Sequence, residues 1–133
     1  MSFVYTSFID EMVHNDYLIP PGTYKVMFVT ERYAASRDHS RRSDVTDEIV
    51  GEGYTTRGWE TSIAMSQADN RPALRVAPIS LGRVNFRAYG AVIYRSNGGR
   101  AVNDELVAYL NFNGTFVFRG SFDMSFGDGI VFG

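Results

Sequence analysis

Apolar residues in the last third of the chain come in short runs that are separated by polar, glycine-containing turns. Residues 90–94, 106–112 and 116–118 are rich in aromatic and β-branched side chains, which favour strands. Asn97-Gly98-Gly99 and Asn113-Gly114 lie between these runs, and such sequences supply the positive φ angles of tight hairpin turns. The pattern therefore predicts consecutive antiparallel hairpins.

The first part of the chain contains one helical pattern. In residues 7–15, Phe8 and Met12 recur at helical spacing, and Pro20-Pro21-Gly22 prevents the helix from continuing. Residues 23–30 are rich in β-formers and alternate imperfectly, as a strand buried on both faces does. We therefore expect a short amphipathic helix followed by a central strand.

The middle of the chain predicts a charged loop and further strands. Residues 31–47 carry charges of mixed sign and few apolar side chains, so they predict a surface loop with room for one helical turn. Further strands are expected at residues 48–54, 59–65, 74–76 and 84–86. About eight short strands and one helix indicate an antiparallel β-sandwich or flattened barrel, with a helix or arm at 1–16 and a β core at 17–133 of a single domain.

Composition narrows the class of protein. The 133 residues include no cysteine, which excludes thiolate nucleophiles and thiolate metal sites. A net charge of −2 gives no general attraction to nucleic acid or to an anionic membrane. No apolar run approaches the roughly 20 residues of a membrane span, and no secretory leader pattern begins the chain, so we expect a soluble, unsecreted product.

Arginine dominates the basic residues. Lys25 is the single lysine among 13 basic residues, and 14% of the chain is aromatic. Arginine and aromatic residues are enriched at protein contact surfaces, where lysine is depleted. Codon bias explains the same composition equally well, and only the exposure of the arginines separates the two interpretations.

Glycine and histidine patterns offer weak candidates for ligand chemistry. The spacing of Gly51-x-Gly53 and Gly58 fits neither a dinucleotide fingerprint nor a P-loop, so a bulge or turn is the better interpretation. His14 and His39 stand outside any ligand-spaced cluster, whereas a zinc site needs three or four ligands close together. We therefore predict no metal site and no cofactor, with His39 solvated or capping a local turn.

Catalytic patterns are also absent. Ser40 follows His39 without a nucleophile elbow, and adjacent side chains in an extended loop point apart. Asp47-Glu48 and Asp104-Glu105 are neighbouring pairs whose carboxyl groups face opposite sides of a strand, not each other across a substrate. The sequence therefore predicts a protein that is not an enzyme.

The order of these segments resembles a widespread set of small virion structural proteins of tailed bacteriophages. The strongest element of the resemblance is Ala91-Val92-Ile93-Tyr94-Arg95 followed, after a glycine turn, by Glu105-Leu106-Val107-Ala108-Tyr109. The other elements are Tyr24-Lys25-Val26-Met27-Phe28-Val29, His39 before Ser43-Asp44, Gly51-Glu52-Gly53-Tyr54, Phe122-Asp123-Met124-Ser125-Phe126 and Gly129-Ile130. Together they span nearly the whole chain.

The resemblance implies a non-enzymatic component of the phage particle. We expect a capsid decoration or cement protein in the virion, made in the host bacterial cytoplasm, that bridges neighbouring copies of the major capsid protein and forms a homo-oligomer in some arrangements. Nucleic acid and membranes are not expected partners. The expected contact residues are aromatic residues and arginines: Phe3, Tyr5, Arg37, Arg41, Arg42, Tyr54 and Trp59.

Three alternatives stay open at this stage. The chain is also compatible with a tail, neck or fibre-associated subunit. A small binding module would hold a ligand or a host glycan through Tyr54, Trp59 and Tyr89. An enzyme of cell-wall degradation is the third alternative. Trp59 itself fits either a core position or an interface anchor.

Overall fold

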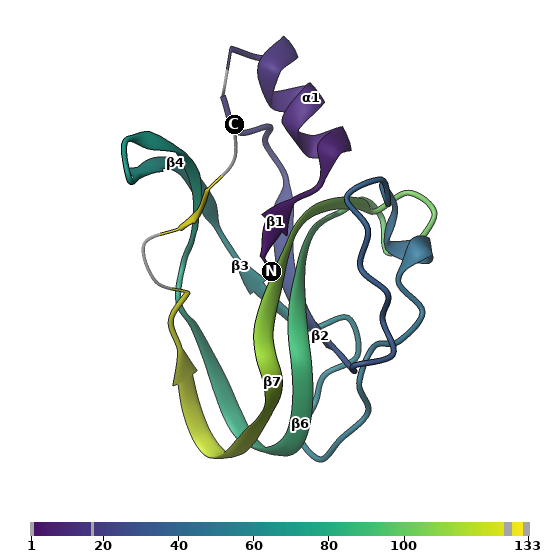
Figure 1. Ribbon diagram of the computed structural model, residues 1–133. Helices are drawn as coiled ribbons and strands as arrows, with labels where there is room; N and C mark the ends of the chain where they lie inside the picture. The colour runs from purple at the N-terminus through teal and green to yellow at the C-terminus, as the bar shows by residue number, and fades with distance from the viewer. Residues whose placement is uncertain (1, 17, 127–128, 132–133) are drawn as a thin grey trace.

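The computed structural model describes residues 2–16, 18–126 and 129–131, which form a mainly β structure with 53% strand and 9% helix. One helix, α1 (Thr6–His14), lies near the N-terminus at the upper end of the molecule (Figure 1). The eight strands among the described residues are β1 (Phe3–Val4), β2 (Thr23–Val29), β3 (Trp59–Thr61), β4 (Ile63–Ala68), β5 (Arg71–Val76), β6 (Ile79–Ser96), β7 (Glu105–Met124) and β8 (Ile130–Val131).

The strands form two antiparallel sheets, which confirms the predicted β-sandwich class. The larger sheet has the order β1-β7-β6-β2-β3, and the smaller one has the order β4-β5-β8. The helix predicted at 7–15 is present as α1, and the predicted central strand is β2, which pairs with β6 on one side and β3 on the other. In the charged loop, η1 (Arg42–Asp44) is the single helical turn that the sequence allowed.

The prediction that all strands are short is wrong for β6 and β7. These strands contain 18 and 20 residues and pair with each other along nearly their whole length. They bend together at the lower end of the molecule and run back up its left side in Figure 1. The long ribbon therefore takes part in both layers of the sandwich.

The prediction of a hairpin at Asn113-Gly114 is also wrong. Asn111 pairs with Gly90 and Phe116 pairs with Ala88, so residues 112–115 form a bulge opposite Tyr89 while β7 continues. Asn113 has φ +59° and Gly114 has φ +147°, the positive angles expected of the pair. The angles serve a bulge here because β6 is long enough to pair with both flanking apolar runs.

Three further strand predictions need correction. Residues 48–54 form no strand and make only the isolated bridges Val29↔Glu48 and Glu52↔Asn85, because the chain turns at Gly53 with φ +76°. Residues 59–65 do not form one strand, since the chain changes sheets at Ser62 between β3 and β4. The runs at 84–86 and 90–94 belong to one strand, β6.

Apolar side chains fill the space on both faces of the larger sheet. The inner core joins Phe28 and Ile93 of this sheet to Leu74 of the smaller sheet and to Phe8 and Met12 of α1. On the outer face, residues of the loop after β2 cover a second cluster that includes Tyr5, Tyr94 and Leu106. No helix in the described part of the chain has the length and apolar character needed to span a membrane.

Candidate functional site

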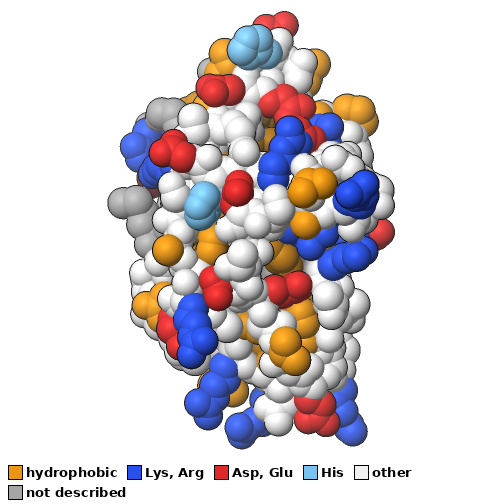
Figure 2. Space-filling view, turned by 90° about the vertical axis from the view of Figure 1, so that its right-hand side faces the viewer, with side chains coloured by type: hydrophobic (Ala, Val, Ile, Leu, Met, Phe, Trp, Pro, Cys, Tyr) orange, Lys and Arg blue, Asp and Glu red, His pale blue; other side chains and the backbone are white. Residues whose placement is uncertain are grey.

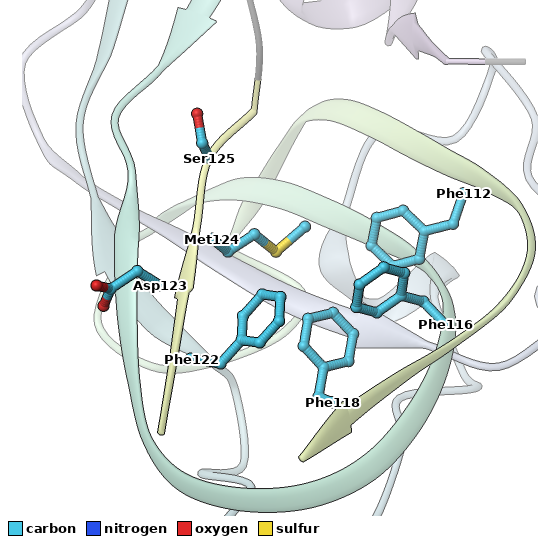
Figure 3. A pocket seen from close by; sticks show the side chains of 7 residues that line it. All are labelled: Phe112, Phe116, Phe118, Phe122, Asp123, Met124 and Ser125. Carbon is cyan, nitrogen blue, oxygen red and sulfur yellow. The ribbon is translucent and has the colours of Figure 1, made fainter. Parts of the chain in front are cut away.

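The bend of the β6–β7 ribbon encloses an apolar pocket. Its lining comes from β7 and from Ser125, the residue that follows it. Figure 3 shows the phenylalanine rings of the lining pointing toward one another between the two arms of the strand. The pocket holds about 180 Å³. We name it the phenylalanine pocket, and its lining residues are Phe112, Phe116, Phe118, Phe122, Asp123, Met124 and Ser125.

The bulge and the strand period explain how β7 builds this pocket. Residues 116, 118, 122 and 124 share one face of the strand, while the bulge brings Phe112 to the same space from the other arm. The Phe116 ring lies 4.7 Å from that of Phe118 and 6.0 Å from that of Phe112, measured between centroids. Phe118 is fully buried, whereas Phe116 is 43% exposed. The pocket therefore has a fixed floor and an exposed aromatic rim.

Three arginines occupy the opposite face of the same ribbon. Arg87 lies opposite Val117, and Arg119 lies opposite Asn85 between Arg83 and Arg87. All three arginines are exposed, and none forms an ion pair with any residue that the structure describes. Figure 2 shows Lys and Arg side chains gathered at the lower end of the molecule, where the ribbon bends. We name Arg83, Arg87, Val117 and Arg119 the arginine face.

The exposure of the arginines favours the contact-surface interpretation of the composition. All twelve arginines except Arg42 and Arg95 are exposed. Exposed arginine beside exposed aromatic and aliphatic side chains is the composition of protein interfaces. Val117, like Phe116, is 43% exposed at the bend. Arginine face and phenylalanine pocket together form a candidate protein-binding end of the molecule.

The N-terminal contact candidates lie in the outer cluster. Tyr5 is fully buried and Phe3 is 7% exposed, so the folded monomer does not offer the Tyr5 side chain to a partner. The Tyr5 and Tyr33 hydroxyls share a 2.8 Å hydrogen bond, and burial with this bond raises the pKa of Tyr5 well above its ordinary value. Arg37 is exposed, with its guanidinium carbon 5.2 Å from the centroid of the Phe3 ring.

Arg41 and Arg42 pair with acids at the start of β7. Arg42 Nε donates a 2.6 Å hydrogen bond to Asp104 Oδ2, and only 1% of Asp104 is exposed. Asp104 also accepts a 2.7 Å bond from the Asn97 backbone N–H. Arg41 lies 3.9 Å from Glu105 and remains exposed. These contacts fix the connection between β6 and β7, so Arg42 has a structural partner within the chain.

Tyr54 and Trp59 pack on the inner core. Both are half-buried, with ring centroids 5.3 Å apart and edge-to-face geometry. The Tyr54 hydroxyl donates to Glu48 Oε2 at 2.6 Å and accepts from the Phe28 backbone N–H at 3.0 Å. The structure does not bring these two residues together with the other contact candidates, and Trp59 is partly buried against the inner core.

The residues that offered weak candidates for ligand chemistry, His39 and Gly51-x-Gly53, make contacts within the chain. His39 Nδ1 and the Tyr33 hydroxyl are hydrogen-bonded at 2.9 Å, and the two rings stack. The turn predicted at Gly51-x-Gly53 is present beside β6, where a side chain at residue 53 would overlap the Arg83 carbonyl oxygen. In the described ranges, no three His, Cys, Asp or Glu residues are grouped to hold a metal ion.

Comparison with known proteins identifies no relative. A scan against protein-family models finds no match, and searches of curated proteins and of solved structures find no similar protein. The site must therefore be interpreted from its own geometry.

Sequence reasoning missed the residues that form the bend. Phe116, Val117 and Arg119 follow Asn113-Gly114; the hairpin predicted there made residues 116–118 an ordinary paired strand and assigned no role to Arg119. One signal was present: apolar residues at 116, 118, 122 and 124 alternate with polar residues at 119, 121 and 123, which predicts one apolar and one polar face. The exposure of Phe116 depends on the bend and has no sequence signal.

Proposed function

We propose that this chain is a virion structural protein of a tailed bacteriophage and that, within this class, it is a capsid decoration protein. The order of its sequence segments resembles that class of protein. The observation that carries the proposal is the exposure of Phe116 over the phenylalanine pocket, at the bend whose other side is the arginine face. An apolar pocket with an exposed aromatic rim, and exposed arginines on the other side of the same bend, have the composition of protein-binding surfaces.

The partner would be the major capsid protein. In this proposal, an apolar side chain of a capsid subunit enters the phenylalanine pocket and contacts Phe116. Acidic side chains of the same or a neighbouring subunit pair with Arg83, Arg87 and Arg119. Because each copy then bridges subunits, many modest contacts add up across the shell. Binding to the assembled lattice, and not to unfolded subunits, shifts the unfolding equilibrium of the shell toward the native state.

Quantification of the protein in fractionated particles tests this proposal. Phage particles are disrupted and separated into DNA-filled heads and tails, and the amount of this chain relative to the major capsid protein is measured by mass spectrometry. A fixed stoichiometric ratio in heads is expected. Recovery with isolated tails and absence from heads would replace the decoration proposal by a tail or neck subunit, and absence from all particle fractions would overturn both.

A further inference from the structure

Strand β4 forms one edge of the smaller sheet and carries none of the features that protect such edges. Among the described residues it pairs only with β5, without a bulge, and in Figure 1 the β4–β5 hairpin lies at the outer margin of the molecule. Natural edge strands are shielded by charged residues, proline, bulges or very short length. The six residues of β4 include no charged residue and no proline. The open edge of β4 is therefore able to accept another strand.

The other edges of the two sheets are protected. Strands β1 and β8 contain two residues each, and β3 contains three residues with Glu60 at its centre. The lower part of the β6–β7 ribbon carries Arg83, Arg87 and Arg119. Among the strands that the structure describes, β4 thus combines an open edge with a length and a neutrality that favour pairing.

The hairpin turn after β4 determines which backbone groups face the open edge. The two-residue loop 69–70, with φ +55° and +60°, connects Ala68 to Arg71. The closing pair of such a loop is hydrogen-bonded, and bonded pairs alternate along an antiparallel ladder. The Ala77 N–H donates a 2.8 Å bond to the Ser62 carbonyl oxygen, which agrees with this alternation. The N–H and C=O groups of the odd-numbered residues of β4 therefore point to the open edge.

The odd-numbered residues allow β4 to pair with itself about a two-fold axis. With the axis at Met65, the two Met65 residues lie opposite each other, and Ile63 of each copy lies opposite Gln67 of the other. Because all of these residues present outward backbone groups, each opposite pair exchanges two N–H···O bonds. A shift of one residue would oppose groups that already bond to β5, and a shift of two would lose a pair. The ladder therefore selects one register.

The side chains of β4 and β5 permit this pairing. Ile63 and Met65 pack partly against the inner core, so the pairing would extend the apolar inner face across the axis and cover more of Met65. The nearest charges are those of Arg71 and Arg75 on β5. Three strand spacings, about 14 Å, would separate them from their counterparts in the other copy. This distance exceeds the screening length of roughly 8 Å at physiological salt, so the two copies do not repel each other strongly.

We propose that two copies of this chain associate through β4, in antiparallel orientation about an axis at Met65. The resulting sheet has the order β8-β5-β4-β4-β5-β8. A second copy is the partner that this edge fits, because its outward groups complement themselves and no like charges meet across the axis. The contact is small, below about 1,200 Å², so the dimer is weak. Pairing leaves the bend of the β6–β7 ribbon, at the other end of the molecule in Figure 1, free in both copies.

Disulfide trapping of the full-length chain tests the register. The chain contains no cysteine, so a single introduced cysteine forms a disulfide only between two copies. Opposite Cα atoms in a bonded antiparallel pair lie about 5.5 Å apart, within the range of a disulfide. Met65→Cys is therefore expected to form a covalent dimer in a glutathione redox buffer. Ala64→Cys is the matched control: residue 64 is more exposed, but its Cα atoms would lie about 8 Å apart, too far for a disulfide.

Amide hydrogen exchange and sedimentation measure the association without a cross-link. In the wild type, exchange of the Met65 and Gln67 amides should slow as the protein concentration rises. The Ala64 and Ser66 amides bond to β5 and should stay protected at every concentration. Gln67→Pro removes one outward N–H from each copy and should weaken self-association at least about tenfold. Gln67→Ala keeps this N–H and should leave self-association unchanged.

Three results would each overturn the proposal. The first is a wild-type protein that stays monomeric up to about 1 mM, with Met65 and Gln67 amides that exchange equally fast at all concentrations. The second is cross-linking of Ala64→Cys that equals or exceeds that of Met65→Cys. The third is self-association that a folded Gln67→Pro variant leaves unchanged. Circular dichroism checks that this variant is folded; if it is not, the cross-linking and the wild-type exchange decide. None of these measurements involves capsids, so this proposal and the proposed function fail separately.

Discussion

The Tyr54 hydroxyl donates a 2.6 Å hydrogen bond to Glu48 Oε2 while it accepts a 3.0 Å bond from the Phe28 N–H. This arrangement attaches the segment between β2 and β3 to the central strand. Burial and the bond to Glu48 raise the pKa of Tyr54 above its ordinary value, so the phenol stays protonated and continues to donate. Tyr54 is therefore a structural residue in the monomer.

Removal of this hydroxyl should destabilise the protein. Tyr54→Phe leaves the Phe28 N–H without its acceptor and removes a donor to Glu48, so we expect a loss of about 1 to 3 kcal/mol in the free energy of unfolding. Tyr89→Phe is the control, since that hydroxyl has no hydrogen-bond partner among the described residues, and it should change stability by less than about 0.5 kcal/mol. Equal effects in urea titrations would contradict the structural role of Tyr54.

Asp104 should be among the acids that matter most for stability. It is buried, and it accepts bonds from Arg42 Nε and the Asn97 N–H. Because Asp104→Ala leaves the Arg42 guanidinium without this partner at a partly buried site, we expect a loss of about 3 kcal/mol. Asp38→Ala, at an exposed position, is the matched control and should cost less than about 0.5 kcal/mol. A similar small loss for both variants in denaturant titrations would argue against the pair.

Alanine substitutions at Gly58 and Gly120 distinguish the cost of backbone strain from the cost of steric overlap. Both adopt positive φ angles, +85° and +76°. A Cβ at residue 58 would overlap the Val26 carbonyl oxygen, whereas nothing lies within 4 Å of one at residue 120. Gly120→Ala should therefore cost about 1 to 2 kcal/mol, the strain of a left-handed residue, and Gly58→Ala about 3 kcal/mol or more. Equal melting temperatures for the two variants would contradict the close approach at Gly58.

Stability should decrease at alkaline pH. Burial raises the pKa of Tyr94 to about 12, and its hydroxyl donates a 2.5 Å bond to the Arg57 carbonyl oxygen. The unfolded chain loses this proton near pH 10.0 while the folded chain retains it, so the contribution is complete below pH 10 and is lost as the pH rises toward 12. In denaturant titrations at several pH values between about 9 and 11, the free energy of unfolding should fall less for Tyr94→Phe than for the wild type.

The tyrosinate absorbance gives an independent check of the alkaline prediction. Burial also raises the pKa values of Tyr5, Tyr24, Tyr33 and Tyr109. At about pH 11 the folded protein should therefore absorb less as tyrosinate than the chain in denaturant, where tyrosine ionises near its ordinary value. Equal absorbance, with the circular dichroism of the native fold intact, would mean that these hydroxyls are not protected.

Local chemistry accounts for the parts of the fold that the sequence predicted. The spacing of Phe8 and Met12 gave the helix, since both side chains are buried on one face of α1. The apolar content of residues 23–29 gave the central strand, because a strand buried on both faces needs little alternation.

Long-range pairing accounts for the parts that the sequence did not predict. Asn113 and Gly114 have positive φ angles, which a hairpin turn also requires, and the pairing of both flanking runs with β6 selects the bulge. The phenylalanine pocket in turn depends on the bend of the β6–β7 ribbon. Phe3 and Arg37 were both predicted as contact residues, and the fold places them side by side although they are far apart in the sequence.

Binding of the purified chain to capsids that lack it tests the central claim most directly. Wild-type protein, Phe116→Asp and Val102→Asp are added to such DNA-filled heads, and the bound fraction is measured by sedimentation. Val102 is 56% exposed in the loop that connects β6 and β7, so it is an exposed apolar control distant from the bend. Both variants should keep the melting temperature of the wild type.

We expect wild type and Val102→Asp to saturate the heads at the same ratio. Phe116→Asp places a charge at the rim of the phenylalanine pocket and should bind at least about tenfold more weakly, equivalent to about 1.4 kcal/mol. Binding of Phe116→Asp with wild-type affinity, or failure of the wild-type protein to bind heads, would contradict the account.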